Sequence, residues 1–236
     1  MKVIYTKNTM YRKEEYAIST QIVESEGQKF VLKKALNNKA IPFVNGLEKN
    51  YQEMVKQYSR ENIAKGELLS PGVFRMEYIA GEALDVICMH LLENGNYNGF
   101  FKNIEYYYHR ILANYTDDTI PVNDFNPMSP NRKYNLDLTL SNIIVLPSGK
   151  IKIIDYEWML PNISKKFELF RTVVFLYDQY KNIFEEKQLT QEKFLEICGF
   201  SAKDIELHNK QEENIEAIIL DWNSFKNERK TIKINF

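Results

Sequence analysis

The chain has 236 residues, enough for one large domain or for two small lobes with cores of their own. Its 31 basic and 32 acidic side chains leave a net charge of −1, so there is no basic excess to indicate nucleic acid binding. Cys88 and Cys198 are isolated and lack the CxxC spacing of a zinc site, which predicts reduced, inert thiols in a cytoplasmic protein.

Strands dominate the first part of the chain. Residues 2–6 and 15–24 have the composition of strands, and the turn Ser25-Glu26-Gly27 predicts a hairpin with residues 28–36. An amphipathic helix is predicted over residues 40–58, with its apolar face centred between Leu47 and Tyr51. Pro71-Gly72 then precedes a further strand over residues 73–79.

Helical patterns dominate from residue 84 onward, at about 84–93, 97–114, 163–182, 190–198 and 203–224. One hairpin interrupts them, in which residues 143–145 and 151–154 flank the turn Leu146-Pro147-Ser148-Gly149-Lys150. Segregated strands and helices predict an α+β fold in two lobes, residues 1–80 and 81–236, with a crevice between them. No apolar run approaches transmembrane length, and the first residues lack the apolar region of a signal peptide, so any membrane contact is expected to be peripheral.

Polar groups that are costly to bury bracket this second hairpin. Asp137 and Asn142 precede it with D-x-x-x-x-N spacing, and Asp155 ends its second strand. A nucleotide phosphotransferase needs a carboxylate at the acceptor hydroxyl and two further oxygen ligands for Mg²⁺ on the phosphates. We expect the hairpin to bring the three side chains together on one magnesium–phosphate cluster, where the cation and hydrogen bonds offset their burial.

The stretch NLDLTLSNIIV…IKIIDYEW resembles the catalytic and metal-binding loops of the protein-kinase-like superfamily, in the small-molecule branch that includes aminoglycoside and choline kinases. Within that branch it is most similar to the kinase-like domains of bacterial surface-polysaccharide (lipopolysaccharide and O-antigen) biosynthesis, whose loops run D-L-T-x-x-N-I and I-D-x-E-W. The resemblance implies a bilobal kinase-like fold that uses ATP and Mg²⁺. It implies Asp137 as catalytic base, and Asn142 and Asp155 as metal ligands.

The same resemblance implies a lysine that reaches the nucleotide phosphates and a helical glutamate that orients it. V-L-K at residues 31–33 is similar to the A-x-K of kinases and selects Lys33, with Lys34 as the alternative. On the following helix Glu48 flanks the apolar face and is the expected partner, with Glu53 as the alternative.

The stretch VFRMEYIAGEAL resembles the hinge strand and linker of the same family. An extended backbone at Glu77 and Ile79 would offer a carbonyl and an amide to adenine. Gly81 would permit the turn into the helical lobe.

The sequence departs from the kinase pattern at three points. No glycine occurs between residues 7 and 20, so Ser19, Thr20 or backbone amides near residues 8–11 would have to cover the phosphates. Asn135 stands where the family has a histidine that braces the catalytic loop. After Asp155 the chain has Tyr156-Glu157-Trp158 in place of the kinase Phe-Gly, and Glu157 is expected to make a structural hydrogen bond, with metal binding as the alternative.

A helical pattern resumes by about Ser164, which leaves little room for the peptide-docking activation segment of a protein kinase. The sequence therefore predicts an ATP-dependent phosphotransferase, a kinase acting on a small molecule or glycan hydroxyl in cell-surface polysaccharide biosynthesis. Two alternatives stay open. One is a pseudokinase that serves as a nucleotide-binding or scaffold module, which the missing glycines favour, and the other is a protein kinase. Oligomeric state has no signature in the sequence.

Overall fold

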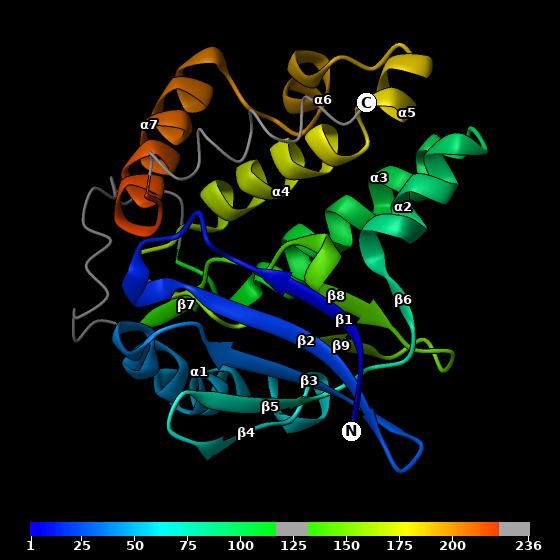
Figure 1. Cartoon of the computed structure of the whole chain (residues 1–236). Coiled ribbons are helices and arrows are strands. Elements are labelled where there is room, and N and C mark those ends of the chain that lie inside the picture. The colour runs from blue at the N-terminus through cyan, green and yellow to red at the C-terminus, as the bar shows by residue number, and fades with distance from the viewer. Residues whose placement is uncertain (117–131, 222–236) are drawn as a thin grey trace, which may run out of the picture. The chain divides into compact units, whose positions relative to one another are not determined.

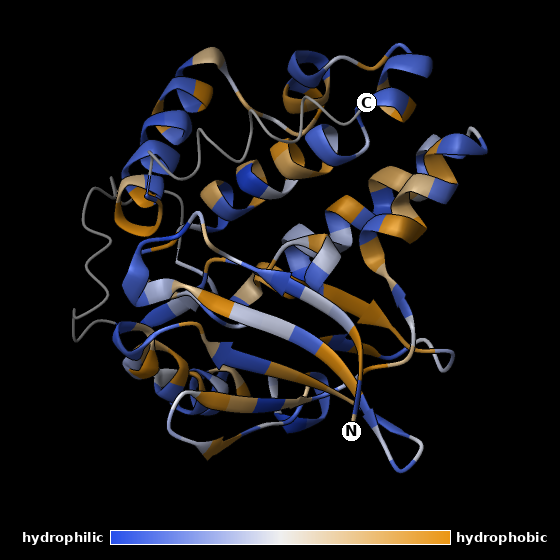
Figure 2. Cartoon of the chain, viewed as in Figure 1, coloured by the Kyte–Doolittle hydropathy of each residue, from blue (hydrophilic) through white to orange (hydrophobic). Residues whose placement is uncertain are grey.

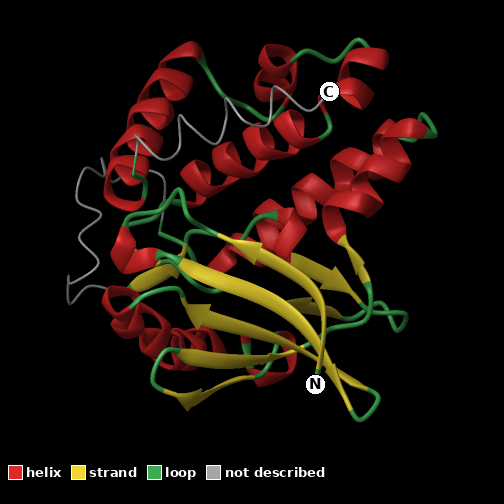
Figure 3. Cartoon of the chain, viewed as in Figure 1, coloured by secondary structure: helices red, strands yellow, loops and turns green. Residues whose placement is uncertain are grey.

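The computed structural model describes residues 1–116 and 132–221. These residues form a mixed α+β protein, which confirms the predicted fold class (Figures 1 and 3). The chain divides into a strand-rich unit, Met1–Ile79 with the described residues from Glu213 onward, and a helical unit, Ala80–Glu212. The sequence predicted lobes of residues 1–80 and 81–236, and that division stays a prediction.

The strand-rich unit contains one five-stranded antiparallel sheet in the order β1-β2-β3-β5-β4 (Figure 1). Helix α1 packs against β3, β4 and β5, with Val44, Leu47 and Met54 fully buried on the face that periodicity predicted. Burial of this face fixes the helix on the sheet. The strands are β1 (Lys2–Asn8), β2 (Ile18–Ser25), β3 (Gln28–Ala35), β4 (Gly66–Ser70) and β5 (Val73–Glu77); α1 spans Ile41–Tyr58, and short 3-10 turns cover Glu14–Tyr16, Asn38–Ala40 and Arg60–Asn62.

The β2–β3 hairpin turns through two residues. Glu26 and Gly27 have φ angles of 53° and 75°, and Ser25 pairs with Gln28. Two successive positive φ angles are those of a type I′ turn, whose twist matches that of the flanking strands. The predicted turn is therefore found at the predicted residues.

The helical unit is built largely from helices (Figure 3). Its core includes the rings of Phe100, Phe184 and Phe194, whose centroids lie 5.0–6.1 Å apart. The helix expected over 97–114 departs from α geometry after Tyr106, and the one expected over 163–182 is interrupted at Tyr180. The helices are α2 (Leu84–Glu93), α3 (Tyr97–Tyr106), a π-helical turn (Tyr107–Ile111), 3-10 turns (Leu112–Asn114 and Leu140–Asn142), α4 (Lys165–Gln179), α5 (Lys181–Glu186), α6 (Gln191–Ile197) and α7 (Ala202–Ile219), the last of which ends in the strand-rich unit.

Two small sheets complete the helical unit. One has the order β6-β8-β9 and contains the predicted hairpin, and Figure 2 shows hydrophobic residues along β8. The other joins β7 and β10; the strands β4, β6, β7 and β10 were not predicted. A Cβ atom on Gly81 would lie 2.5 Å from the carbonyl oxygen of Val145, so only glycine lets the chain approach β8 this closely. The strands are β6 (Glu82–Ala83), β7 (Lys133–Asn135), β8 (Ile143–Val145), β9 (Ile151–Ile153) and β10 (Met159–Pro161).

The two cysteines lie in the helical unit. Burial raises the pKa of both Cys88 and Cys198 to about 12. Because the thiolate is the nucleophile, both side chains are in the unreactive thiol form at neutral pH.

Within residues 1–116 and 132–221, no helix combines the length and the apolar character needed to cross a membrane.

Candidate active site

The β8–β9 hairpin returns the chain so that Asn142 and Asp155 meet at its open end. Its tight turn forms because Pro147 and Gly149 suit a type I turn followed by a left-handed residue; Gly149 has a φ of 79° and donates its amide to Leu146 at 2.8 Å. Ile143 then pairs with Ile153, and the amide of Ile154 donates to the carbonyl of Asn142 at 3.0 Å. Ile154 thus lies opposite Asn142, and Asp155 is the next residue in the chain.

Asn135 ties the loop that carries Asp137 to the strand end that carries Asp155. Its side-chain Nδ2 donates to the carbonyl of Asp155 at 2.6 Å, and its Oδ1 accepts from the amide of Asp137 at 3.1 Å. Asn135 is completely buried. An amide carries a donor and an acceptor at fixed separation, so one side chain can connect the two segments. Asn135 therefore braces the loop that carries Asp137.

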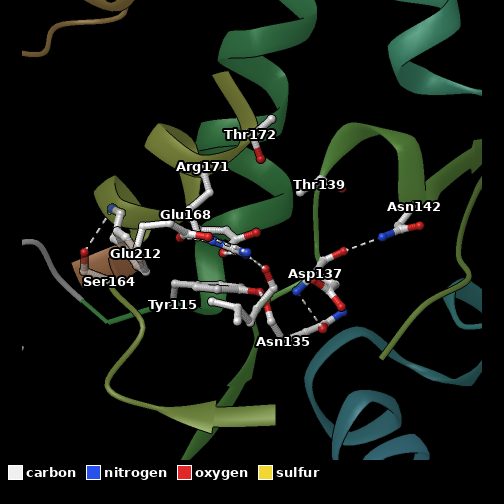
Figure 4. A network of polar contacts seen from close by, with 12 residues as sticks. Tyr115, Asn135, Asp137, Thr139, Asn142, Ser164, Glu168, Arg171, Thr172 and Glu212 are labelled. Atoms are coloured by element: carbon white, nitrogen blue, oxygen red, sulfur yellow. Dashed lines mark hydrogen bonds and ion pairs between the residues drawn. The ribbon is translucent and has the colours of Figure 1, made fainter. Parts of the chain in front are cut away.

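Asn142 also contacts the Asp137 loop. Its Nδ2 donates to the backbone carbonyl of Asp137 at 2.8 Å, as Figure 4 shows. The remaining polar atom of the amide is the oxygen, which is the atom that can bind a hard cation.

Three carboxylates gather where these segments meet. They belong to Asp137, Asp155 and Glu157, and one carboxylate oxygen of each lies within 4.8 Å of the others. The two aspartates are half-buried and Glu157 is buried. Two unit charges 4 Å apart repel by about 4 kcal/mol at an effective dielectric constant of about 20. The cluster therefore favours a cation or a bound proton.

The donor set consists of carboxylate oxygens with an amide group close by, which fits Mg²⁺ rather than a metal that prefers nitrogen or sulfur. Glu157 belongs to this cluster by position. Its backbone amide also donates to Oδ1 of Asp155 at 3.2 Å, so it takes part in structural hydrogen bonding as well. The role of the Glu157 carboxylate stays a prediction.

A buried arginine reaches the same loop from α4 and was not predicted from the sequence. Arg171 donates through Nη1 to the carbonyl of Leu136, the residue before Asp137 (Figure 4). Its Nε and Nη2 donate to Oε2 and Oε1 of Glu212 on α7, at 2.7 and 3.3 Å. Burial lowers the pKa of Arg171, but the charges of Glu212 and Glu168 raise it above its ordinary value, so the guanidinium is charged.

Glu168, one turn before Arg171 on α4, is fully buried. Its nearest approach to the guanidinium is 3.8 Å, and neither carboxylate oxygen has a hydrogen-bond partner among the described residues. Burial raises the pKa of Glu168 well above its ordinary value; Arg171 opposes this shift, and the charges of Asp137 and Glu212 add to it. Burial therefore favours the protonated form of Glu168 more strongly than it would be favoured in an exposed glutamate. A charged pair three residues apart in an otherwise apolar run was the sequence signal for this cluster.

The predicted phosphate-binding residues lie in the strand-rich unit. Lys33 is in β3, between Thr20 on β2 and Phe74 on β5, and its side chain is only 3% exposed, whereas Lys34 is half-buried. Glu48 is exposed on α1, and Glu53 forms an ion pair with Lys56 at 2.8 Å. The pairing of Lys33 with Glu48 stays a prediction.

The predicted hinge also lies in this unit. Glu77 ends β5, its amide donates to the carbonyl of Lys65 at 2.8 Å, and its carboxylate accepts from the amide of Lys65 at 3.2 Å. Ile79 follows β5 outside regular structure and is half-buried. Adenine binding by this backbone stays a prediction.

No protein-family model matches the chain, and no curated protein matches it in sequence. Among solved structures, the chain is similar to that of the choline kinase LicA from Streptococcus pneumoniae. The two are 16% identical and superpose with a TM-score of 0.42, over 89% of this chain and 82% of that one.

Proposed function

We propose that the protein is an ATP-dependent phosphotransferase that moves the γ-phosphate of ATP onto a hydroxyl of a small molecule or glycan. One observation carries the proposal: a hairpin and a braced loop bring Asp137, Asp155 and Glu157 within 4.8 Å of one another, with the amide of Asn142 bonded to the same loop. Oxygen ligands and a carboxylate for the acceptor are what phosphoryl transfer asks of a protein.

In this proposal Asp137 orients the acceptor hydroxyl and takes its proton. Asn142, Asp155 and Glu157 would hold Mg²⁺. When bound, the ion would neutralise charge on the phosphates. Lys33, oriented by Glu48, binds the phosphates, and the backbone at Glu77 and Ile79 holds adenine. The protein's contribution is placement, because phosphoryl transfer requires little covalent chemistry from side chains.

The segment after the metal-binding loop supports a small acceptor. Only residues 156–164 separate Asp155 from α4, and three of them form β10, which pairs with β7. The oxygen of Ser164 accepts from the amide of Phe167 at 3.1 Å and begins α4 there. This short, paired connection offers no long segment to dock a peptide. The loops resemble those of surface-polysaccharide kinases. We therefore propose that the acceptor is a glycan of cell-surface polysaccharide biosynthesis and that it is phosphorylated in the cytoplasm.

The β1–β2 connection favours one other function, that of a scaffold without catalysis. This connection contains no glycine and is fixed to the end of the described chain. The amide of Lys13 donates to the carbonyl of Ile219 at 2.9 Å, and the amide of Asp221 donates to the carbonyl of Tyr11 at 3.0 Å. A glycine-rich connection covers the phosphates in kinases, and a fixed, glycine-free one is suited to a protein that does not bind nucleotide.

The rate of ATP consumption by wild type and by an Asp137 variant tests the proposal. We expect Mg²⁺-dependent consumption of ATP in the presence of a panel of sugars and small alcohols, and we expect Asp137→Asn to lower the rate by about 10²- to 10⁴-fold. Asp178→Asn, which changes an exposed carboxylate on α4, is the matched control and should retain the wild-type rate. Equal turnover in Asp137→Asn and the control would remove Asp137 as the base. Absence of an ATP-induced thermal shift, with and without Mg²⁺, would support the scaffold.

A further inference from the structure

The peptide unit that joins Leu136 to Asp137 is held at both of its ends. Arg171 donates to its carbonyl oxygen, and its amide donates to Oδ1 of Asn135 at 3.1 Å (Figure 4). A peptide unit is planar, so fixing its oxygen and its nitrogen fixes the orientation of the whole plane. The next peptide unit is held as well, because Asn142 donates to the carbonyl of Asp137 at 2.8 Å.

These contacts together constrain the direction of the Asp137 side chain. With the planes on both sides of its Cα atom held, the two backbone torsions of Asp137 are fixed, and with them the Cα–Cβ bond. Asn135 and Asn142 belong to the loop itself or to the adjoining strand. Arg171 is the contact that comes from a separate helix, α4, and joins the loop to the body of the helical unit.

Glu212 holds Arg171 in the orientation that this contact requires. The Nε and Nη2 atoms of the guanidinium both bind the carboxylate of Glu212, which leaves Nη1 directed at the carbonyl of Leu136. The arginine side chain is 6% exposed and that of Glu212 is 20% exposed, so water competes weakly for either group. A lysine ammonium has no fork with which to make both contacts at once.

We propose that Arg171 is a positioning residue for Asp137 and that Glu212 orients Arg171 for this purpose. The proposal rests on the proposed phosphotransferase function. Arg171 acts through the Leu136 carbonyl and touches neither the nucleotide nor the acceptor. Weakening it therefore displaces the base in the reaction step while leaving nucleotide binding as it was.

The test compares kcat and KM for ATP in the full chain carrying Arg171→Lys or Glu212→Gln. We expect kcat to fall by about 10- to 100-fold, the cost of a misplaced reacting group, with KM for ATP unchanged. Asp204→Asn is the matched control, because Asp204 is also on α7 and binds Lys166 of α4 at 2.9 Å. It also accepts from Ser201 at the start of α7. We expect this control to lower the midpoint of thermal unfolding and to retain the wild-type kcat.

Two results would overturn the proposal. One is an unchanged kcat in folded Arg171→Lys and Glu212→Gln, and the other is an equal loss of kcat in Asp204→Asn, which would reveal a general structural effect. Asp137→Asn in the same assay separates this failure from that of the proposed function. If wild-type turnover does not depend on Asp137, the phosphotransferase proposal fails, and the proposed role of Arg171 fails as well.

Discussion

Glu168 and Glu212 both lie beside Arg171, but only Glu212 is within hydrogen-bonding distance of the guanidinium. Glu168 is fully buried, and Arg171, Asp137 and Glu212 are the charged groups that act on it. Since burial dominates, the folded protein binds a proton at Glu168 more tightly than the unfolded chain does. The contribution of Glu168 to the free energy of unfolding is therefore fully present below its unfolded-state pKa. It is lost as pH rises through its folded-state pKa.

Replacing Glu168 by glutamine should remove this pH dependence. Glutamine has the shape of the protonated acid and stays neutral, so we expect Glu168→Gln to raise the midpoint of thermal unfolding relative to wild type at pH 8, and by much less at pH 4. Scanning calorimetry across this range measures the difference. Glu206→Gln, an exposed acid on α7, is the control and should show no such gain. A wild-type protein more stable than Glu168→Gln at pH 8 would contradict a pKa of Glu168 raised by burial.

At the residue scale, the sequence carries information on contacts that are local in the chain, while the roles of Asp137, Asn142 and Asp155 stay predictions. Asp137, Asn142 and Asp155 were expected to meet because a short hairpin lies between the last two, and the backbone of that hairpin does bring Asn142 next to Asp155. The contact of Arg171 with Leu136 spans 35 positions and that with Glu212 spans 41. No local pattern contains a contact of this length, so Arg171 could not be placed from the sequence.

Among the elements, the approach of β6 to β8 depends on Gly81. A Cβ atom there would lie 2.5 Å from the carbonyl oxygen of Val145 and 2.6 Å from Cγ2 of Ile144. We expect Gly81→Ala to lower the free energy of unfolding by about 1–3 kcal/mol, because the backbone of β8 has to move. Urea unfolding followed by circular dichroism measures this change.

Gly46, in the middle of α1, provides the opposite case. A Cβ atom at Gly46 meets nothing within 4 Å, so alanine adds helix propensity at no steric cost. Gly46→Ala should therefore raise the free energy of unfolding by about 0.5–1 kcal/mol. If both substitutions had the same effect, the close approach at Gly81 would not be what makes glycine necessary there.

The elements that sequence predicted best are those with a strong local signal. The turn residues around Gly27 and Gly149 predicted both hairpins, and apolar periodicity predicted α1 and α2. The strands β4, β6, β7 and β10 were missed because they are short and are defined by their pairing partners. The π-helical turn after α3 was read as continuous helix, since the apolar pattern continues through it. The last part of the helix expected over 203–224 lies outside the described residues.

For the whole molecule, composition and the order of elements were enough to predict the α+β class, and the boundary at 80/81 stays a prediction. They did not predict that α7 begins in the helical unit and ends in the strand-rich unit, because its amphipathic pattern does not reveal which core it joins. The roles of Lys33, Glu48, Glu77 and Ile79 in nucleotide binding stay predictions.

Magnesium-dependent binding of ATP at the carboxylate cluster is the central claim. Titration calorimetry of ATP tests it most directly, with wild type, Asp155→Asn and the Asp178→Asn control, each with and without Mg²⁺. We expect Mg²⁺ to strengthen ATP binding in wild type and in the control, and to have no such effect in Asp155→Asn, because that variant loses a carboxylate of the metal site. Equal Mg²⁺ dependence in all three proteins, or binding in none, would contradict the account.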